Sequence, residues 1–337
     1  MGEGSTGTPK RGGRGQQGHV PVLLKEAIDF LAVRRGGTYI DATVGLGGHS
    51  CEIAKRLGAQ GRLIGFDKDP AALEMARVRF ESERAGLAQD IRREARDRGQ
   101  ALEDWPAIEL IQGSFAQLRE HCAPHSTEGI LADLGLSSLE LSDPARGFSF
   151  QAEGALDMRM DPHSELTAEQ VVNQFDEREL ADLIYEFGEE RRSRRIARAI
   201  VRSRPIRSPA HLAAVISAAA WPMKFERIHP ATRTFQALRI FVNRELDDLG
   251  QLLRQAPQVL KTGGRLVVIS FHSLEDRMVK DAMRQAAQLG EYRLLTKKPV
   301  VAEEDEIQQN PRSRSAKLRA AERISPKYGF ERTNLRH

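Results

Sequence analysis

The sequence predicts an α/β fold, a Rossmann-like sheet with an inserted helical domain. Residues 38–67 read as a strand, a glycine-rich turn, a helix and a second strand that ends in an acid. Further strand signals lie near 108–112, 129–134 and 264–270, and about 130 residues with mostly helical signals separate the last two. That stretch is too long for one crossover helix, so we expect the insertion at 142–232.

The glycine-rich turn indicates a nucleotide-type cofactor site. Glycines at 45, 47 and 48 let the backbone turn tightly and approach a ligand, while amide N–H groups of the next helix point at it. Asp67 follows Gly45 by 22 residues, a spacing at which an acid accepts hydrogen bonds from both ribose hydroxyls. We therefore expect Gly45, Gly47, Gly48 and Asp67 to bind a cofactor.

The spacing also separates the candidate cofactors. A dinucleotide fingerprint counted from Gly45 requires a third glycine at position 50, where the chain has Ser50. Asp41 ahead of Gly45-x-Gly47-Gly48 is more typical of an S-adenosylmethionine site. A tight turn without a ligand is the structural alternative.

Local signals place the other elements of the first part of the chain. After a Gly-rich, polar tail at 1–18, which we expect to be disordered, an apolar-periodic helix runs to about Leu31. Asp69 is an N-cap signal and Pro70 suits the first helical position, so a helix should run from there to about residue 84. Residues 84–104 are charge-rich and poor in large apolar residues, which predicts an exposed extension.

Helical signals dominate the predicted insertion. Thr167-x-x-Gln170 resembles a capping box, and apolar residues at helical spacing follow it as far as Phe187. Ser208-Pro209 begins another helix, and a long periodic pattern covers 235–253. The α/β domain then comprises 19–141 and 233–337.

Composition favours a soluble cytoplasmic protein. The 337 residues are 40% hydrophobic, which is enough for a large core and a second, smaller unit. No apolar run reaches the roughly 18 residues of a membrane span, and the polar start is unlike a secretory signal.

We expect no metal site. Cys51 and Cys122 lack metal-ligand spacing, and their number argues against a disulfide framework. His272, Glu275 and Asp276 could project together from a helix start, but no second histidine has suitable spacing. A structural hydrogen-bond network is the favoured interpretation of these three.

Two strongly basic stretches are suited to a phosphate backbone. Residues 191–207 contain eight arginines and no acid, and residues 312–336 contain eight basic residues against Glu322 and Glu331. A solvated helix face is the alternative for either stretch. The candidate residues for contacts with nucleic-acid phosphates are Arg191, Arg192, Arg194, Arg195, Arg233, Arg312 and Arg314.

In such a fold the ligand site lies at the carboxyl ends of the strands, so the turn after 41, Asp67, the segment after 112 and Asp133 should converge on one cleft. Phe115 is placed to pack against a purine, with a core position as the alternative. Asp133 opens the loop where a methyl acceptor would meet the cofactor, with a cap or turn role as the alternative.

Several long, ordered motifs carry a resemblance over nearly the whole chain after the tail. They include Asp41-Ala42-Thr43-x-Gly45-x-Gly47-Gly48-His49-Ser50, Asp133-Leu134-Gly135-x-Ser137-Ser138, Arg146-Gly147-Phe148-Ser149-Phe150, His229-Pro230-Ala231-Thr232-Arg233 and Ser270-Phe271-His272-Ser273-Leu274-Glu275-Asp276-Arg277. With them the chain resembles the ribosomal RNA small-subunit methyltransferase H family, which are cytosine-N4 methyltransferases.

The resemblance implies a class I methyltransferase sheet and S-adenosylmethionine-dependent methylation of the exocyclic N4 of one cytidine in the decoding region of 16S ribosomal RNA. It assigns Gly47, Gly48 and His49 to the methionine end of the cofactor and Asp67 to the ribose. It further places Phe115 near the adenine and Asp133 near the reacting centre.

One cofactor contact departs from the family pattern. The family's Ser-Ser-Pro-Gln stands here as Ser137-Ser138-Leu139-Glu140, and the aspartate that follows in the family is Ser142. Glu140 keeps an acceptor and loses the N–H donors of an amide. We expect an altered cofactor contact at Glu140 without loss of activity.

The expected reaction is direct displacement of the sulfonium methyl group by the cytosine amine, which needs alignment and a group that receives a proton. We assign that role to Asp133 or to the loop from Leu134 to Ser138, which includes Ser137 and Ser138. The expected partner is small-subunit ribosomal RNA or the 30S subunit, with no membrane; monomer and dimer both stay open.

Other function classes give different expectations. A non-catalytic RNA-binding assembly factor that retains the cofactor pocket is the main alternative. A DNA cytosine-N4 methyltransferase is disfavoured because no Pro-Pro-aromatic motif follows Asp133. An NAD-linked oxidoreductase is disfavoured by Ser50 and by the basic insertion.

Overall fold

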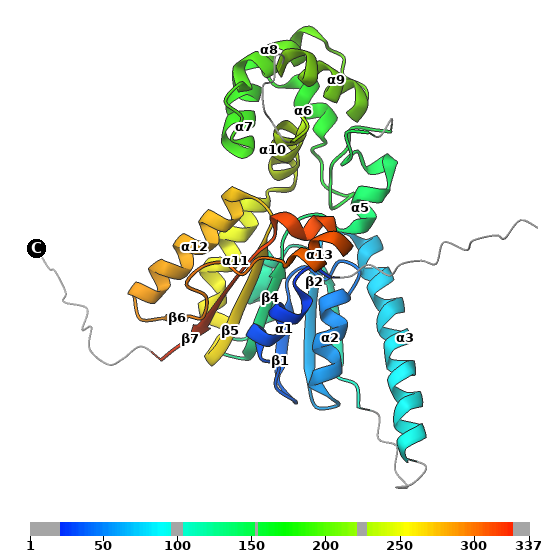
Figure 1. Cartoon of the computed structure of the whole chain (residues 1–337), viewed down its shortest axis with the longest axis vertical. Helices are drawn as coiled ribbons and strands as arrows, with labels where there is room; N and C mark the ends of the chain where they lie inside the picture. Colours follow the sequence, from blue (N-terminus) through cyan, green and yellow to red (C-terminus); the bar gives the residue numbers. More distant parts are fainter. Residues whose placement is uncertain (1–20, 96–103, 152–153, 221–227, 326–337) are drawn as a thin grey trace, which may run out of the picture.

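The computed structural model describes residues 21–95, 104–151, 154–220 and 228–325. A sheet with helices on both faces forms the lower part of the molecule in Figure 1, and a separate group of helices stands above it. The predicted α/β fold with a helical insertion is confirmed. The expected tail at 1–18 lies outside the described residues.

The sheet has the strand order β3-β2-β1-β4-β5-β7-β6. Strands β1 to β5 run parallel, whereas β7 pairs antiparallel with β5 and β6. The chain moves outward in one direction from β1 and then returns to β4, so the order reverses between these two strands, where α/β folds bind ligands. The bounds are β1 Thr38–Asp41, β2 Arg62–Asp67, β3 Ala107–Gln112, β4 Thr127–Asp133, β5 Leu260–Ser270, β6 Tyr292–Leu294 and β7 Lys317–Arg323.

Side chains of the central strands alternate between two cores. On β5, Val267 and Ile269 enter one core, while Leu266 and Val268 enter the other. Helices α1 (Leu24–Leu31), α2 (Gly48–Leu57) and α3 (Pro70–Ala95) cover the first core, and α4 (Leu118–His121), α11 (Glu245–Val259) and α12 (Ser273–Gln288) cover the second. Burial on both faces explains why these strands read as continuous apolar runs.

Two sequence expectations about elements were wrong, and one strand was not predicted. Helix α3 continues to Ala95 instead of ending near residue 84. The pattern at 235–253 is two helices, α10 (Thr232–Asn243) and α11, because Arg244 adopts a left-handed φ of 52° between them. Strand β7 was missed because basic residues alternate with its buried apolar ones.

The upper helices form a unit with its own core. It contains α6 (Ala168–Gln174), α7 (Glu177–Gly188), α8 (Ser193–Arg202) and α9 (Pro209–Ala220), and α10 packs with them (Figure 1). The predicted capping box of Thr167 and Gln170 is confirmed at the start of α6. We propose that this unit extends from 142 through α10 to Asn243, beyond the expected end at 232, because Phe235 and Leu238 belong to its core. No helix in the described segments has the length and apolarity that a membrane span requires.

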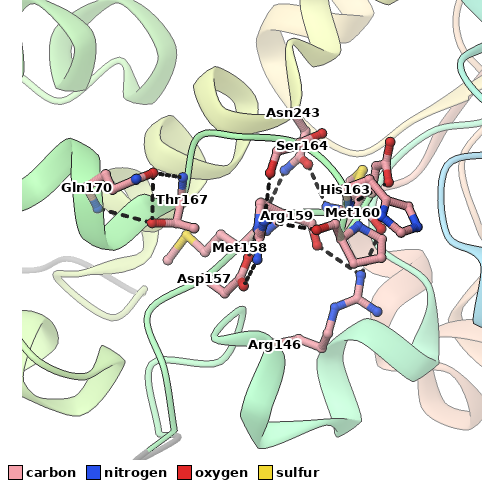
Figure 2. A network of polar contacts seen from close by, with 12 residues as sticks. Arg146, Asp157, Met158, Arg159, Met160, His163, Ser164, Thr167, Gln170 and Asn243 are labelled. Atoms are coloured by element: carbon pink, nitrogen blue, oxygen red, sulfur yellow. Dashed lines mark hydrogen bonds and ion pairs between the residues drawn. The ribbon is translucent and has the colours of Figure 1, made fainter.

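A polar network of Arg146, Arg159 and Asn243 lies at the base of the helical unit (Figure 2), and Arg146 also joins this network to the turn after β2. Arg146, in the short helix η2 (Pro144–Arg146), places Nη1 2.8 Å from Asp69 Oδ2 and donates from Nη2 to the carbonyls of Arg159 and Met160. Asn243 Oδ1 accepts from the Met160 amide at 2.7 Å. The turn after β2 is thereby bound to the base of the helical unit.

Candidate functional site

A pocket of about 320 Å³ opens at the carboxyl ends of the parallel strands. The loops after β1, β2, β3 and β4 line it, together with parts of α10, α11 and the start of α12. We call it the central pocket. The turn after residue 41, Asp67, Phe115 and Asp133, which the sequence placed in one cleft, all line it.

Glycines in the turn between β1 and α2 reduce the side-chain cover on one wall of the central pocket. Gly45 and Gly47 have φ values of 51° and 76°, in the left-handed region that favours glycine. A Cβ on Gly45 would meet no atom within 4 Å, so this position faces open space. A Cβ on Gly48 would lie 2.3 Å from Pro21 Cγ, so Gly48 permits close packing of the N-terminal segment. Gly45 and Gly48 line the pocket, whereas Gly47 does not.

Asp67, at the end of β2, is held by two backbone donors. Its Oδ2 accepts from the Gly45 amide at 2.7 Å, and its Oδ1 accepts from the Asp69 amide at 2.9 Å. Burial raises its pKa to about 6, although these hydrogen bonds oppose the shift. Each carboxylate oxygen keeps a second lone pair, so Asp67 can still accept hydrogen bonds from a ligand's hydroxyls.

Asp133, the last residue of β4, carries a buried oxygen without a partner. Within the described part of the chain its Oδ1 has no hydrogen bond, while its Oδ2 lies 3.5 Å from His49 Nδ1. Burial, reinforced by the charges of Asp41 and Glu275, raises the pKa of Asp133 well above its usual value. The other ring nitrogen of His49, Nε2, lies 3.1 Å from the Val22 carbonyl.

Asp41, the last residue of β1, is linked to Asp133 through hydrogen bonds of Thr43. It is buried and accepts from the Ser50 hydroxyl at 2.6 Å and from the Thr43 amide at 3.1 Å. Burial raises its pKa to about 6. The Thr43 hydroxyl in turn accepts from the Asp133 amide at 2.7 Å. Ser50, the residue that departs from the dinucleotide fingerprint, therefore holds the Asp41 side chain in place ahead of the glycine turn.

The loop after β4 ends in the short helix α5 (Ser138–Ser142), which Ser137 and Glu140 cap reciprocally. Glu140 Oε2 accepts from the Ser137 amide at 2.7 Å, and Ser137 Oγ accepts from the Glu140 amide at 3.2 Å. Burial, together with the charge of Asp67, raises the pKa of Glu140 to about 7. The Ser138 hydroxyl accepts from Arg312 at 2.7 Å. Both serines line the pocket, and both hydroxyls accept hydrogen bonds from protein donors.

Phe115 begins the short helix η1 (Phe115–Gln117) after β3. It lines the central pocket and also packs against the core under α4 and α11, so the pocket and core interpretations both hold in part. Beside it, Ser114 Oγ donates to Asp248 Oδ2 at 2.7 Å, and Lys68 lies 2.6 Å from the same oxygen. Lys68 and Asp248 line the pocket but were not predicted.

Sequence reasoning did not place the charged groups near α10 and α12 in the pocket, although it expected Glu275 in a hydrogen-bond network. Arg239 donates to both oxygens of Glu245 at 2.8 Å. Glu275 is 2% exposed and accepts from the Phe271 amide at 2.8 Å. Phe271 and Glu275 follow β5 directly, so the strand-end rule was sufficient to find them. Arg239 and Glu245 come from two helices where the sequence pattern indicates one.

The expected network around His272 is present. His272 caps α12, and its Nε2 lies 3.1 Å from Glu275 Oε1, although without hydrogen-bond geometry. Burial opposes ionisation of Glu275, but His272 and the charge of Arg239 hold its pKa below the usual value. Glu245, His272 and Glu275 offer ligand atoms within 4.8 Å of one another, as a cation site would. Both Glu245 oxygens already pair with Arg239, which accounts for their position without a metal.

Helix α8 displays most of the first basic stretch. Ile196, Ala197 and Ile200 are buried, while Arg194 and Arg195 on the other face are exposed. The remaining exposed arginines of the stretch are Arg191, Arg198, Arg202 and Arg207. Arg204 instead donates to the Val172 and Phe175 carbonyls within the helical unit. The exposed arginines are therefore available for a partner, whereas Arg204 stabilises the helical unit.

The other predicted RNA-binding arginines are more dispersed. Arg192 is half-buried, and Arg233 is 40% exposed with Nη1 3.9 Å from Glu190. Arg312, in helix η3 (Pro311–Ser315), lines the mouth of the central pocket, and Arg314 is exposed on the same helix. Part of the second basic stretch stabilises the packing of the sheet, because Arg319 on β7 forms an ion pair with Asp276 at 2.7 Å. Residues 326–336 lie outside the described segments.

Comparison with known proteins gives matches over nearly the whole chain. The model of the MraW methylase family matches residues 16–324. A protein of Koribacter versatilis named ribosomal RNA small subunit methyltransferase H is 66% identical over 317 residues, which are 93% of this chain and 97% of that protein. Proteins of the same name from Acidobacterium capsulatum and Solibacter usitatus are 59% and 48% identical, each over 90% of this chain and 98% and 99% of the relative.

Proposed function

The chain belongs to the MraW methylase family, and from this premise we propose that it methylates the N4 nitrogen of one cytidine in the decoding region of 16S ribosomal RNA. It is a methyltransferase, and its methyl donor is S-adenosylmethionine. The observation that carries the proposal is the central pocket, where Asp67 at the end of β2 and Asp133 at the end of β4 line one cavity.

The residues of the central pocket fit the cofactor. The open space at Gly45 leaves room for it beside the turn, and Asp67 keeps lone pairs for two ribose hydroxyls. We assign the adenine side to Phe115, because an aromatic ring packs well on a purine. Glu140 retains the acceptor that caps α5, so the departure from the family's glutamine preserves the fold of this loop. When bound, S-adenosylmethionine supplies an electrophilic methyl group.

Asp133 is positioned to serve the acceptor amine. The lone pair of a cytosine amine is delocalised into the ring, so the amine is a weak nucleophile. Alignment of the amine with the methyl group compensates for this, because proximity and orientation can lower the reaction barrier by up to roughly 7–11 kcal/mol. Asp133 lines the central pocket, and a carboxyl oxygen is an acceptor for an N4–H donor. Asp133 therefore orients the amine and stabilises the charge that develops on it.

We assign RNA binding to two surfaces. Arg191, Arg194 and Arg195 give the helical unit an exposed basic face, and Arg312 stands at the pocket mouth. The target base must leave its stack to reach the pocket, which favours an unpaired or weakly paired segment. Such contacts fix a phosphate backbone and make binding depend steeply on salt. A ribosomal substrate also implies a cytoplasmic location.

Transfer of labelled methyl from S-adenosylmethionine to purified ribosomal subunits lacking the modification tests the proposal. We expect label in small subunits and none in large subunits. Cofactor binding without transfer to small subunits, partly assembled particles or free RNA would favour the assembly-factor alternative. Replacing Arg191, Arg194 and Arg195 by glutamine should lower the salt slope of RNA binding by about 0.7 for each single-strand phosphate that these arginines neutralise. An unchanged slope would contradict the assignment of this face.

A further inference from the structure

We propose that Asp248 selects the adenine ring of S-adenosylmethionine, with its Oδ1 accepting a hydrogen bond from the exocyclic N6 amine of that base. The inference deepens the proposed function and rests on the assignment of Phe115 to the adenine side. It gives a task to a pocket-lining acid that no sequence motif singled out.

Asp248 lies beside Phe115 at the wall of the central pocket. Helix α11, which carries Asp248, packs against η1, which begins with Phe115. The hydroxyl of Ser114, the residue before Phe115, donates to Asp248 Oδ2 at 2.7 Å. Asp248 and Phe115 both line the pocket. A purine packed on the Phe115 ring would therefore have the Asp248 carboxylate among its neighbours.

The two oxygens of Asp248 have different surroundings. Oδ2 accepts from Ser114 Oγ and lies 2.6 Å from Lys68 Nζ. Ser114 Oγ itself accepts from the Ala116 amide at 3.0 Å, so its own hydrogen is directed to Asp248. Within the described segments Oδ1 of Asp248 makes no hydrogen bond, and unlike Oδ1 of Asp133 it is not a buried atom. The carboxylate is thus held through one oxygen and offers the other to a ligand.

The open oxygen distinguishes bases by the group at carbon 6 of the purine. Adenine carries an amine there, whose N–H groups donate, whereas guanine and hypoxanthine carry an oxo group, which only accepts. Oδ1 pairs with the amine, but against an oxo group two acceptors would face each other. A site that is built to bond a ligand's N–H rejects the analogue lacking it, because the polar group of the site is left unpaired.

The same wall of the pocket would hold the ribose and the base. Asp67, the ribose acid, is followed directly by Lys68, whose ammonium group lies against Asp248. The ammonium offsets the charge of the carboxylate, so a neutral base can approach it. Lys68 Nζ also donates to the Asn243 carbonyl at 2.6 Å, which fixes its position. We therefore regard Lys68 and Ser114 as positioning residues for Asp248.

The first test compares two nucleosides on the wild type. S-inosylhomocysteine carries an oxo group in place of the amine of S-adenosylhomocysteine and is otherwise alike. We expect calorimetry to find its affinity roughly 10- to 100-fold lower. Equal affinities would overturn the inference. The measurement needs no RNA, so it tests Asp248 even if the protein failed to methylate small subunits and the proposed function were wrong.

The variant Asp248→Asn tests whether this residue makes the selection. Ser114 and Lys68 both donate to the Oδ2 position, so the amide should turn its oxygen to them and its NH2 group to the ligand. A donor then faces the base. Affinity for S-adenosylhomocysteine should fall at least about 10-fold, and the preference should shift towards S-inosylhomocysteine.

The matched control is Asp247→Asn. Asp247 lies next to Asp248 in the first turn of α11, but its side chain is 70% exposed and pairs with Arg244. Both affinities should stay within about twofold of wild type in this variant. Thermal unfolding without ligand establishes that each variant keeps its fold, and the wild-type comparison requires no variant.

Two results with Asp248→Asn would refute the assignment. One is an unchanged preference between the two nucleosides. The other is an equal loss of affinity for both, which would make Asp248 a support of the pocket wall. Phe115→Leu tests the premise separately, because loss of the ring should weaken both nucleosides alike. Unchanged affinity for both would remove Phe115 from the adenine side and overturn the inference with it.

Discussion

Replacing Glu140 by glutamine should stabilise the protein above neutral pH and have little effect near pH 5. Glu140 is 4% exposed, and burial together with the charge of Asp67 raises its pKa from the ordinary 4.5 to about 7. Glutamine keeps the side-chain oxygen that accepts from the Ser137 amide, so the cap of α5 survives. The substitution therefore removes only the cost of ionising a buried acid.

The magnitude follows from the two pKa values. Between about pH 4.5 and pH 7 the folded protein holds the Glu140 proton and the unfolded chain releases it, so stability falls as pH rises through this range. The difference between 4.5 and about 7 corresponds to roughly 3 kcal/mol, and the full reduction in stability is reached only above pH 7. Coupled titration of Asp67 makes this an upper value.

Urea unfolding followed by circular dichroism measures the effect at about pH 5 and about pH 8. The matched control is Glu179→Gln, since Glu179 holds the same capping-box position on α7 but is exposed. We expect Glu140→Gln to raise the unfolding free energy by up to roughly 3 kcal/mol at the higher pH and by less than about 1 kcal/mol at pH 5. An equal change at both pH values, or a destabilised variant at the higher pH, would refute the reasoning.

Substitutions at Asp67, at the Arg146–Asp69 pair and at two glycines of the turn test individual contacts of the site and of its support. Asp67→Asn should weaken binding of S-adenosylhomocysteine by roughly 10- to 100-fold in calorimetry, because an amide cannot accept through both of its terminal atoms; unchanged affinity would remove Asp67 from the ribose site. Arg146→Met should lower the unfolding free energy by about 3 kcal/mol, because it leaves Asp69 buried without its cation. A double-mutant cycle with Asp69→Asn should return a coupling above about 0.5 kcal/mol, and additivity would contradict the pairing. Gly48→Ala should displace Pro21 and lower thermal stability, whereas Gly45→Ala should act chiefly through its left-handed backbone.

The parts of the fold that the sequence predicted share a local cause. The turn after β1, the caps of α3 and α6 and the apolar run of β5 each follow from a few neighbouring residues and their chemistry. The break at Arg244 does not, because arginine carries no signal for a left-handed backbone and tertiary packing imposes it. Strand β7 depends on pairing with β5, a contact distant in sequence.

The candidate site divides in the same way. Gly45, Asp67, Phe115 and Asp133 were found because strand ends of an α/β sheet meet at one edge. Arg239 and Glu245 reach the pocket only through the packing of α10 and α11, which no local motif encodes. The link between Asp133 and His49 required the side-chain geometry, because motif spacing does not show which ring nitrogen faces the acid.

Mass spectrometry of nucleosides from small subunits methylated in vitro tests the central claim most directly. The account predicts N4-methylcytidine at one position of 16S ribosomal RNA, with Asp133→Asn strongly reducing its formation. Methylation of carbon 5 or of a ribose hydroxyl, or full turnover by Asp133→Asn, would contradict the placement of an exocyclic amine against Asp133.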